Sequence, residues 1–185
     1  MKCYVALGQQ AFTVDKYSIV PIRSEDRHDI MKWRNEQMYH LRQSEPLTEE
    51  AQNAYFSTTV ESLFDQVQPK QLLFSFLKGK KCVGYGGLVH INWIDNNAEI
   101  SFIMQTEYEK RHFQEFWSIF LSLIEKVAYT ELRLHKLFVY AFDLRPHLYS
   151  VLSLNTYTLD AVLTDHCFFN GKYIDVIIYS KIFDS

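Results

Sequence analysis

Alternation of apolar and polar positions predicts strands along most of this chain. The clearest pair is 83–91 and 98–104, which flank the turn residues Asp95, Asn96 and Asn97. Asn170-Gly171 is an equally strong turn signal, and it predicts a hairpin near the end of the chain. The predicted strands are 17–23, 72–77, 83–91, 98–104, 137–142, 159–168 and 173–182, with a further short hairpin of 4–7 and 12–14 around Gly8.

Apolar positions three and four residues apart predict helices between these strands. Ser24 can cap a helix that runs to about residue 35, and residues 48–50 begin a second helix. The longest helical pattern runs from 108 to about 130, and a short one covers 147–154. Phe116, Phe120 and Ile124 should lie on the buried face of the long helix. Together the elements predict a mixed, mostly antiparallel α/β sheet flanked by helices, in one domain of residues 1–185.

Composition excludes several classes of function. The net charge is −3, which does not favour a nucleic-acid partner. Cys3, Cys82 and Cys167 show neither a disulfide framework nor the spacing of metal ligands, so no metal is expected. No stretch of about 18 apolar residues indicates a membrane segment. The chain also begins without the apolar run of a signal peptide, so we expect it in the cytoplasm.

Five short segments, in this order and spacing, resemble the Gcn5-related N-acetyltransferase (GNAT) superfamily, in its ribosomal-protein and amino-sugar branch. They are 19–26, 31–35, 83–87, 98–102 and 170–176, and the resemblance covers about 17–183. It implies the GNAT fold, with a V-shaped opening between the strands around 101–105 and 137–142. It also implies acetyl-CoA as cosubstrate and a small amine as acceptor, with a nucleotide-linked amino sugar as one acceptor class. A homodimer is compatible with it.

The resemblance assigns roles on the acceptor side of this opening. Transfer of an acetyl group to an amine requires a base for the ammonium proton. Glu99, on a strand lining the cleft, is the candidate base; the alternative is an exposed carboxylate or an arginine partner. His90 lies on the neighbouring strand and is assigned to the acceptor together with Arg34, Asn35 and Tyr39.

The cofactor loop departs from the family pattern. A GNAT loop carries two small residues, usually glycines, whose backbone N–H groups hold the pyrophosphate at a helix N-terminus. Lys110 and His112 occupy those positions here. Two interpretations are open: basic side chains replace the glycines by charge, or this segment is a solvated helix start. The residues assigned to the cofactor are Phe102, Ile103, Met104, Lys110, Arg111, His112, Phe113, Gln114 and Arg145.

A second departure concerns the acid that protonates the leaving thiolate. The family's usual tyrosine falls on Leu152, and its preceding asparagine falls on Arg145. Tyr149 and Tyr157 are the nearby candidates for this role. These departures leave an alternative from another class, a GNAT-fold binding or assembly protein that has lost CoA binding. A protein N-terminal acetyltransferase is a third, less favoured hypothesis.

Overall fold

One mixed sheet organises the chain. Within residues 2–41 and 43–183, which are those that the computed structural model describes, the sheet has eight strands. The strands are β1 (Phe12–Val14), β2 (Tyr17–Pro21), β3 (Leu72–Lys78), β4 (Lys81–Asn92), β5 (Asn97–Met104), β6 (Lys136–Phe142), β7 (Thr158–Phe169) and β8 (Lys172–Ile182). Their order is β1-β2-β3-β4-β5-β6-β8-β7, and only the β5–β6 pair is parallel. The predicted fold class is therefore confirmed.

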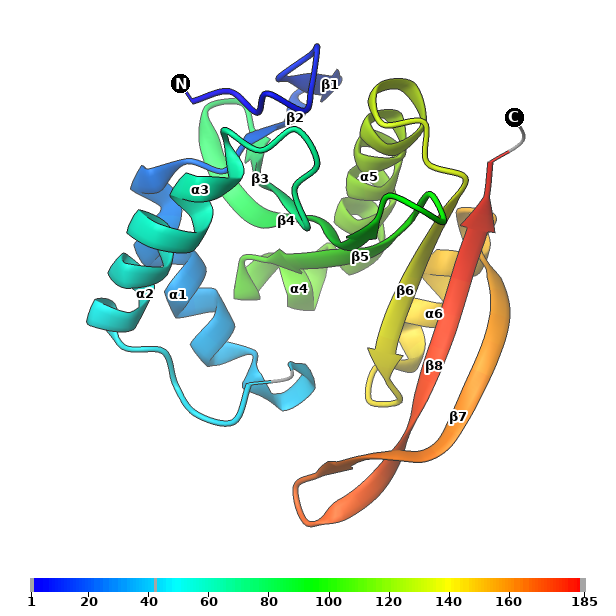
Figure 1. Ribbon diagram of the computed structural model, residues 1–185. Helices are drawn as coiled ribbons and strands as arrows, with labels where there is room; N and C mark the ends of the chain where they lie inside the picture. The colour runs from blue at the N-terminus through cyan, green and yellow to red at the C-terminus, as the bar shows by residue number, and fades with distance from the viewer. Residues whose placement is uncertain (1, 42, 184–185) are drawn as a thin grey trace.

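Helices cover both sides of the sheet (Figure 1). Helices α1 to α3 gather beside the first strands, whereas α5 and α6 pack behind the middle and last strands. None of the described helices is long and apolar enough to cross a membrane. The α-helices are α1 (Arg27–Glu36), α2 (Glu49–Tyr55), α3 (Glu61–Leu63), α4 (Thr106–Arg111), α5 (Phe113–Lys126) and α6 (Pro146–Leu154). Two short 3-10 helices, η1 (Ser24–Asp26) and η2 (Met38–His40), and two π-helical segments, η3 (Phe56–Val60) and η4 (Val127–Glu131), complete the list.

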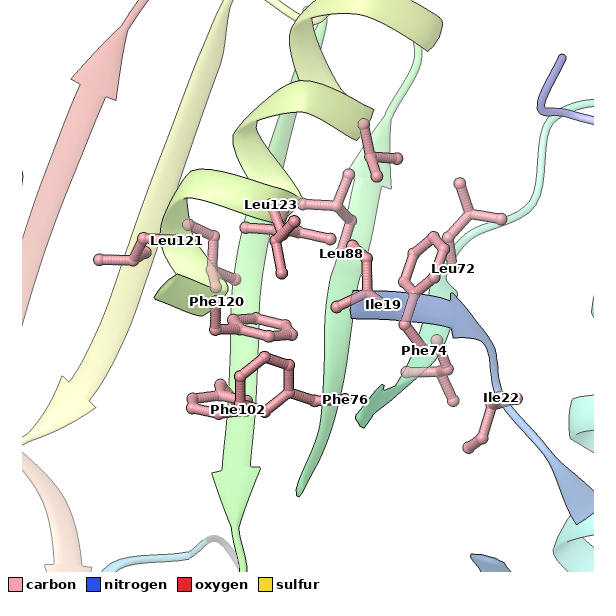
Figure 2. Packing of buried hydrophobic residues seen from close by; sticks show 14 of the residues in the cluster. Ile19, Ile22, Leu72, Phe74, Phe76, Leu88, Phe102, Phe120, Leu121 and Leu123 are labelled. Carbon is pink, nitrogen blue, oxygen red and sulfur yellow. The ribbon is translucent and has the colours of Figure 1, made fainter. Parts of the chain in front are cut away.

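An aromatic cluster joins α5 to the centre of the sheet (Figure 2). Phe102 of β5 stacks on Phe120 of α5 with ring centroids 4.0 Å apart, and Phe76 meets both rings edge-on. Burial of each such ring stabilises the fold by roughly 1.5–3 kcal/mol. Gly86 of β4 leaves room for this packing, because a Cβ there would lie 2.8 Å from Phe120 Cζ and overlap the carbonyl oxygen of Ser101.

Strands β5 and β6 separate soon after they meet. Their pairing is confined to residues 97–99 of β5 and 136–138 of β6, and β6 then follows β8 along its whole length. Beyond Glu99 the two strands diverge, as Figure 1 shows. The predicted V-shaped opening is therefore present, and in the described part of the chain no strand pairs with the β5 edge that faces it after residue 99.

Two details of the predicted elements were wrong. Residues 4–7 form a turn, held by hydrogen bonds from Gln10 Nε2 to the carbonyls of Tyr4 and Leu7, so only 12–14 pairs with the sheet. The helical pattern from 108 is broken at His112 (φ −132°, ψ 25°), which separates α4 from α5. The long helix does begin next to His112, as predicted. Residues 1, 42, 184 and 185 of the predicted domain lie outside the described residues.

Candidate functional site

The opening between β5 and β6 contains a cavity of about 400 Å³. Its walls come from residues 99–103 of β5 and 139–142 of β6, with α1, α5 and α6 closing the sides. Alternation along β5 divides the lining into two faces. Phe102 points to α5, where it stacks on Phe120, whereas Glu99 and Ser101 point to the opposite face. Two ligands, one on each face of β5, can therefore meet in the gap between β5 and β6.

Glu99 is brought against His90, its neighbour on β4. Glu99 Oε2 lies 2.8 Å from His90 Nδ1, within a hydrogen bond. The Glu99 side chain is 11% exposed, whereas that of His90 is 67% exposed. The pair thus connects a buried carboxylate in the cavity to the solvent. Of the interpretations of Glu99 raised above, an exposed carboxylate does not hold, because the side chain is largely buried and lines the cavity.

The backbone at His90 is distorted to make this pair. His90 has a φ of +50°, a left-handed conformation that is unusual for a non-glycine residue. The register between β4 and β5 also shifts between Val89 and Asn92, as expected for a bulge. A bulge redirects a side chain that regular pleating would place elsewhere. Strain of this kind is concentrated at functional sites in proteins.

Arg34 reaches the acceptor-side face from α1. Its Nη1 donates to Tyr85 Oη at 2.7 Å, and its Nε donates to Gln43 Oε1 at 3.1 Å. Asn35, predicted beside it, has a different role. Its amide binds the backbone of Leu47 in both directions, at 2.8 and 2.9 Å, so it holds the loop before α2. Arg34 lines the cavity and Asn35 does not.

The segment predicted as the cofactor loop forms a helix, α4. In α4 the backbone N–H of His112 is bonded to the Tyr108 carbonyl at 2.7 Å, so it is not available to an anion. Arg111 is paired with Glu107 at 2.9 Å, and Lys110 lies in a separate hollow beside α1. Gln114 is exposed on the first turn of α5. The basic segment therefore does not converge on the cavity, although α5 itself begins without a side-chain cap.

Arg145 lines the cavity near the start of α5. Its guanidinium lies 5.7 Å from the centre of the Phe113 ring, and its Nη1 is 3.9 Å from Glu109 Oε1. Burial lowers the pKa of Arg145, and the nearby Glu109 opposes this shift. A guanidinium stays charged under these conditions. Tyr39 donates to the same Glu109 oxygen at 2.9 Å, outside the cavity lining.

The candidate acids for the thiolate are not brought to the cavity. Tyr157 is only 2% exposed, and Leu152 is fully buried in α6. Tyr149 donates to Asp143 at 2.9 Å; burial and this bond raise its pKa, which weakens it as an acid. Among the described lining residues, Tyr140 is the only tyrosine. Of the other residues predicted for the cofactor, Phe102 and Ile103 line the cavity, and Met104 accepts a bond from Gln37 through its carbonyl.

Comparison with known proteins gives the family. A model of the acetyltransferase (GNAT) domain matches residues 19–178, which is most of the chain. The chain belongs to the GNAT acetyltransferase family. The V-shaped opening, the cavity and the mixed sheet are thus those of a GNAT domain. None of the curated proteins compared with the sequence matches it significantly.

Solved GNAT structures share the fold at low sequence identity. Spermidine N-acetyltransferase from Vibrio cholerae, in complex with CoA and spermine, superimposes with a TM-score of 0.76 at 19% identity, over 90% of this chain and 95% of that one. A dodecameric structure of the same enzyme in an intermediate state gives a TM-score of 0.72 at 19% identity, over 90% and 94%. Identity this low carries the fold and not the acceptor.

Sequence reasoning missed several residues of this GNAT cavity. Tyr85 holds Arg34, and His40, Gln71 and Trp117 line the walls. Tyr85 had a detectable signal, because it is a large side chain among Gly84, Gly86 and Gly87, and alternation directs it away from α5. His40 and Gln71 gave no such signal, since both come from irregular segments that the fold brings to the cavity.

Proposed function

We propose that this protein is an acetyl-CoA-dependent N-acetyltransferase that acts on a small amine, with Glu99 as the general base. The observation that carries the proposal is the Glu99–His90 pair at the cavity between diverging β5 and β6, joined by a 2.8 Å contact. Membership of the GNAT family supports the reaction class. The Glu99 base, the cofactor contacts and the acceptor are the parts that experiment must test.

Three features of the chain fit acetyl-CoA. The β5 edge at residues 100–103 has no strand partner and presents backbone groups to an amide-containing arm. The uncapped N-terminus of α5 offers the N–H groups of Phe113 and Gln114 to a pyrophosphate. The Arg145 guanidinium adds a positive charge at the same end of α5. Acetyl-CoA supplies the thioester whose acetyl group the amine attacks.

The protein's own part in the reaction is proton transfer and orientation. The Glu99 carboxylate accepts a proton from the ammonium of the acceptor, directly or through one water. His90 lies on the solvent side of the same carboxylate and provides the way out for that proton. Its two ring nitrogens allow one to face Glu99 while the other faces water. The distorted backbone at His90 keeps the ring in this position.

The sequence segments and the structural neighbours suggest two different classes of acceptor amine. The sequence segments resemble acetyltransferases of nucleotide-linked amino sugars, and the structural neighbours are spermidine N-acetyltransferases. Both classes offer a primary amine, so both are consistent with Glu99 as base. We propose a small-molecule amine as the acceptor, with the nucleotide-linked amino sugar as the finer hypothesis from the sequence.

Calorimetric titration of the full chain with acetyl-CoA and with CoA tests the cofactor part. We expect saturable binding; no measurable heat at high micromolar ligand would favour a non-catalytic binding or assembly protein instead. Glu99→Gln should lower kcat by about a hundredfold without loss of CoA affinity, since general base catalysis typically contributes 10²–10⁴. Glu50→Gln, an exposed site on α2, is the matched control. An unchanged kcat at saturating amine would remove Glu99 from the mechanism.

A further inference from the structure

A second pocket lies next to the cavity, on the Glu99 face of β5. It has a volume of about 300 Å³ and lies between α1, α2 and the sheet. The pocket and the main cavity share a wall, which is formed by Arg34, Gln71, Val89 and Ser101. The remaining walls of the pocket are mostly apolar and aromatic, with Tyr55 and Phe56 among them. Arg34 therefore stands between the cavity that contains Glu99 and this second pocket.

Arg34 is half-buried, and among the described residues its guanidinium donates hydrogen bonds to neutral groups only. A guanidinium has five N–H donors. Two of them bind Tyr85 Oη and Gln43 Oε1, neither of which carries a negative charge. No carboxylate of the described residues forms an ion pair with Arg34. The interaction with Tyr85 outweighs desolvation and raises the pKa of Arg34, and an anion supplied by a ligand would add the full counter-charge that no described residue provides.

The charges of the residues around Arg34 also favour an acceptor with an anionic group. Glu99 is the only carboxylate among the described residues that line either the cavity or the second pocket. The arginines among the described lining residues are Arg34 and Arg145. A polyamine would bring further ammonium groups into this space, where Glu99 alone could neutralise them. An acceptor with an anionic group would instead be complementary to Arg34 and leave Glu99 to its amine.

We propose that Arg34 is a specificity-determining residue, which selects acceptor amines that carry a carboxylate or phosphate group and excludes polyamines. The proposal rests on the proposed N-acetyltransferase function and names its substrate class. Two residues of a strand span roughly 7 Å, so Ser101, which lines the same two pockets as Arg34, is about that far from Glu99 on the same face. The Nη1 and Nη2 donors that remain on Arg34 suit a two-oxygen contact with either anion. Tyr85 and Gln43 fix the orientation of the guanidinium.

Matched acceptor pairs test the proposal through kcat/KM. Glucosamine 6-phosphate against glucosamine isolates a phosphate, and β-alanine against β-alaninamide isolates a carboxylate; spermidine represents the polyamines. We expect the wild-type protein to prefer one charged member at least tenfold over its neutral partner and over spermidine. Arg34→Gln should abolish this preference, mainly through KM, and Arg34→Lys should restore part of it. Lys32→Gln removes a cation from the exposed side of the same helix, and it should leave the preference unchanged.

Binding provides a readout that does not require turnover. Calorimetry of the same amines with the CoA-saturated protein should show the charged member binding at least tenfold more tightly, and Arg34→Gln should remove the difference. Spermidine as the best acceptor, equal use of both members of each pair, or binding of neither charged amine would overturn the proposal. Failure of the wild-type protein to bind CoA would instead refute the proposed function. The two failures are therefore distinguishable.

Discussion

Acidification should destabilise this protein through His40, a buried histidine that lines the cavity. Burial, followed by the nearby Arg145 charge, lowers the pKa of His40 to about 3. In the unfolded chain a histidine has a pKa of about 6.5. The unfolded state therefore binds a proton between these values while the folded state does not, and stability is lost as pH falls below about 6.5. Above that pH both states are neutral and the contribution is constant.

The size of the effect follows from the two pKa values. One pKa unit corresponds to about 1.4 kcal/mol, so His40 should lower the free energy of unfolding by roughly 2 kcal/mol between pH 7 and pH 5. For a chain of this length, such a loss lowers Tm by roughly 4–8 °C. Arg145, His147 and Arg34 lie near enough to His40 to disfavour its protonation, and Gln37 lies on the same turn. Among the described residues the buried Nδ1 of His40 has no hydrogen-bond partner, so a proton on that nitrogen of the imidazolium would be unsatisfied.

Urea denaturation at several pH values measures this slope. We expect His40→Gln to remove about 2 kcal/mol of the change between pH 7 and pH 5, whatever its effect on stability at pH 7. His28→Gln, on the exposed side of α1, is the matched control and should keep the wild-type slope. The same slope in wild type and His40→Gln would refute the reasoning, because His40 would then titrate alike in both states.

Three further results should follow from the structure. Gly86→Ala should destabilise the fold by roughly 2 kcal/mol in urea denaturation, since its Cβ would overlap the backbone of β5. Asp26→Ala should cost roughly 3 kcal/mol in the same assay, because this buried carboxylate accepts from a guanidinium and a hydroxyl. Arg145→Gln should weaken CoA binding about tenfold in calorimetry. Joint Lys110→Ala and Arg111→Ala, which change cations away from the cavity, should alter it less than about threefold.

The sheet was predictable because its signals are local. Alternation and turn chemistry gave the β4–β5 and β7–β8 hairpins, and their order gave the sheet class. The first predicted hairpin failed for a local reason as well. Gln10 binds two carbonyls of the 4–7 segment, so side-chain bonds replace the strand pairing that the apolar pattern indicated.

The site was only partly predictable, because it depends on contacts between distant segments. Glu99 and Arg34 were assigned through the family resemblance, and both line the cavity. Asn35 and Tyr157 were placed equally well in sequence, yet one binds a loop backbone and the other is buried. Neighbours on one helix or one loop point in different directions, and only tertiary packing decides which of them faces a ligand.

Lys110 and His112, at the two glycine positions of the family's cofactor loop, change which groups can hold an anion. Glycine would favour an open turn with free N–H groups, whereas the Glu, Lys and Arg of 107–111 have high helix propensity. Helix α4 forms in consequence, and its backbone donors become internal, as the His112 to Tyr108 bond shows. An anion near α5 must then be held by donors that remain, at the first turn of α5 and on Arg145. The lost glycines thus argue for a different anion site and not, by themselves, for a lost one.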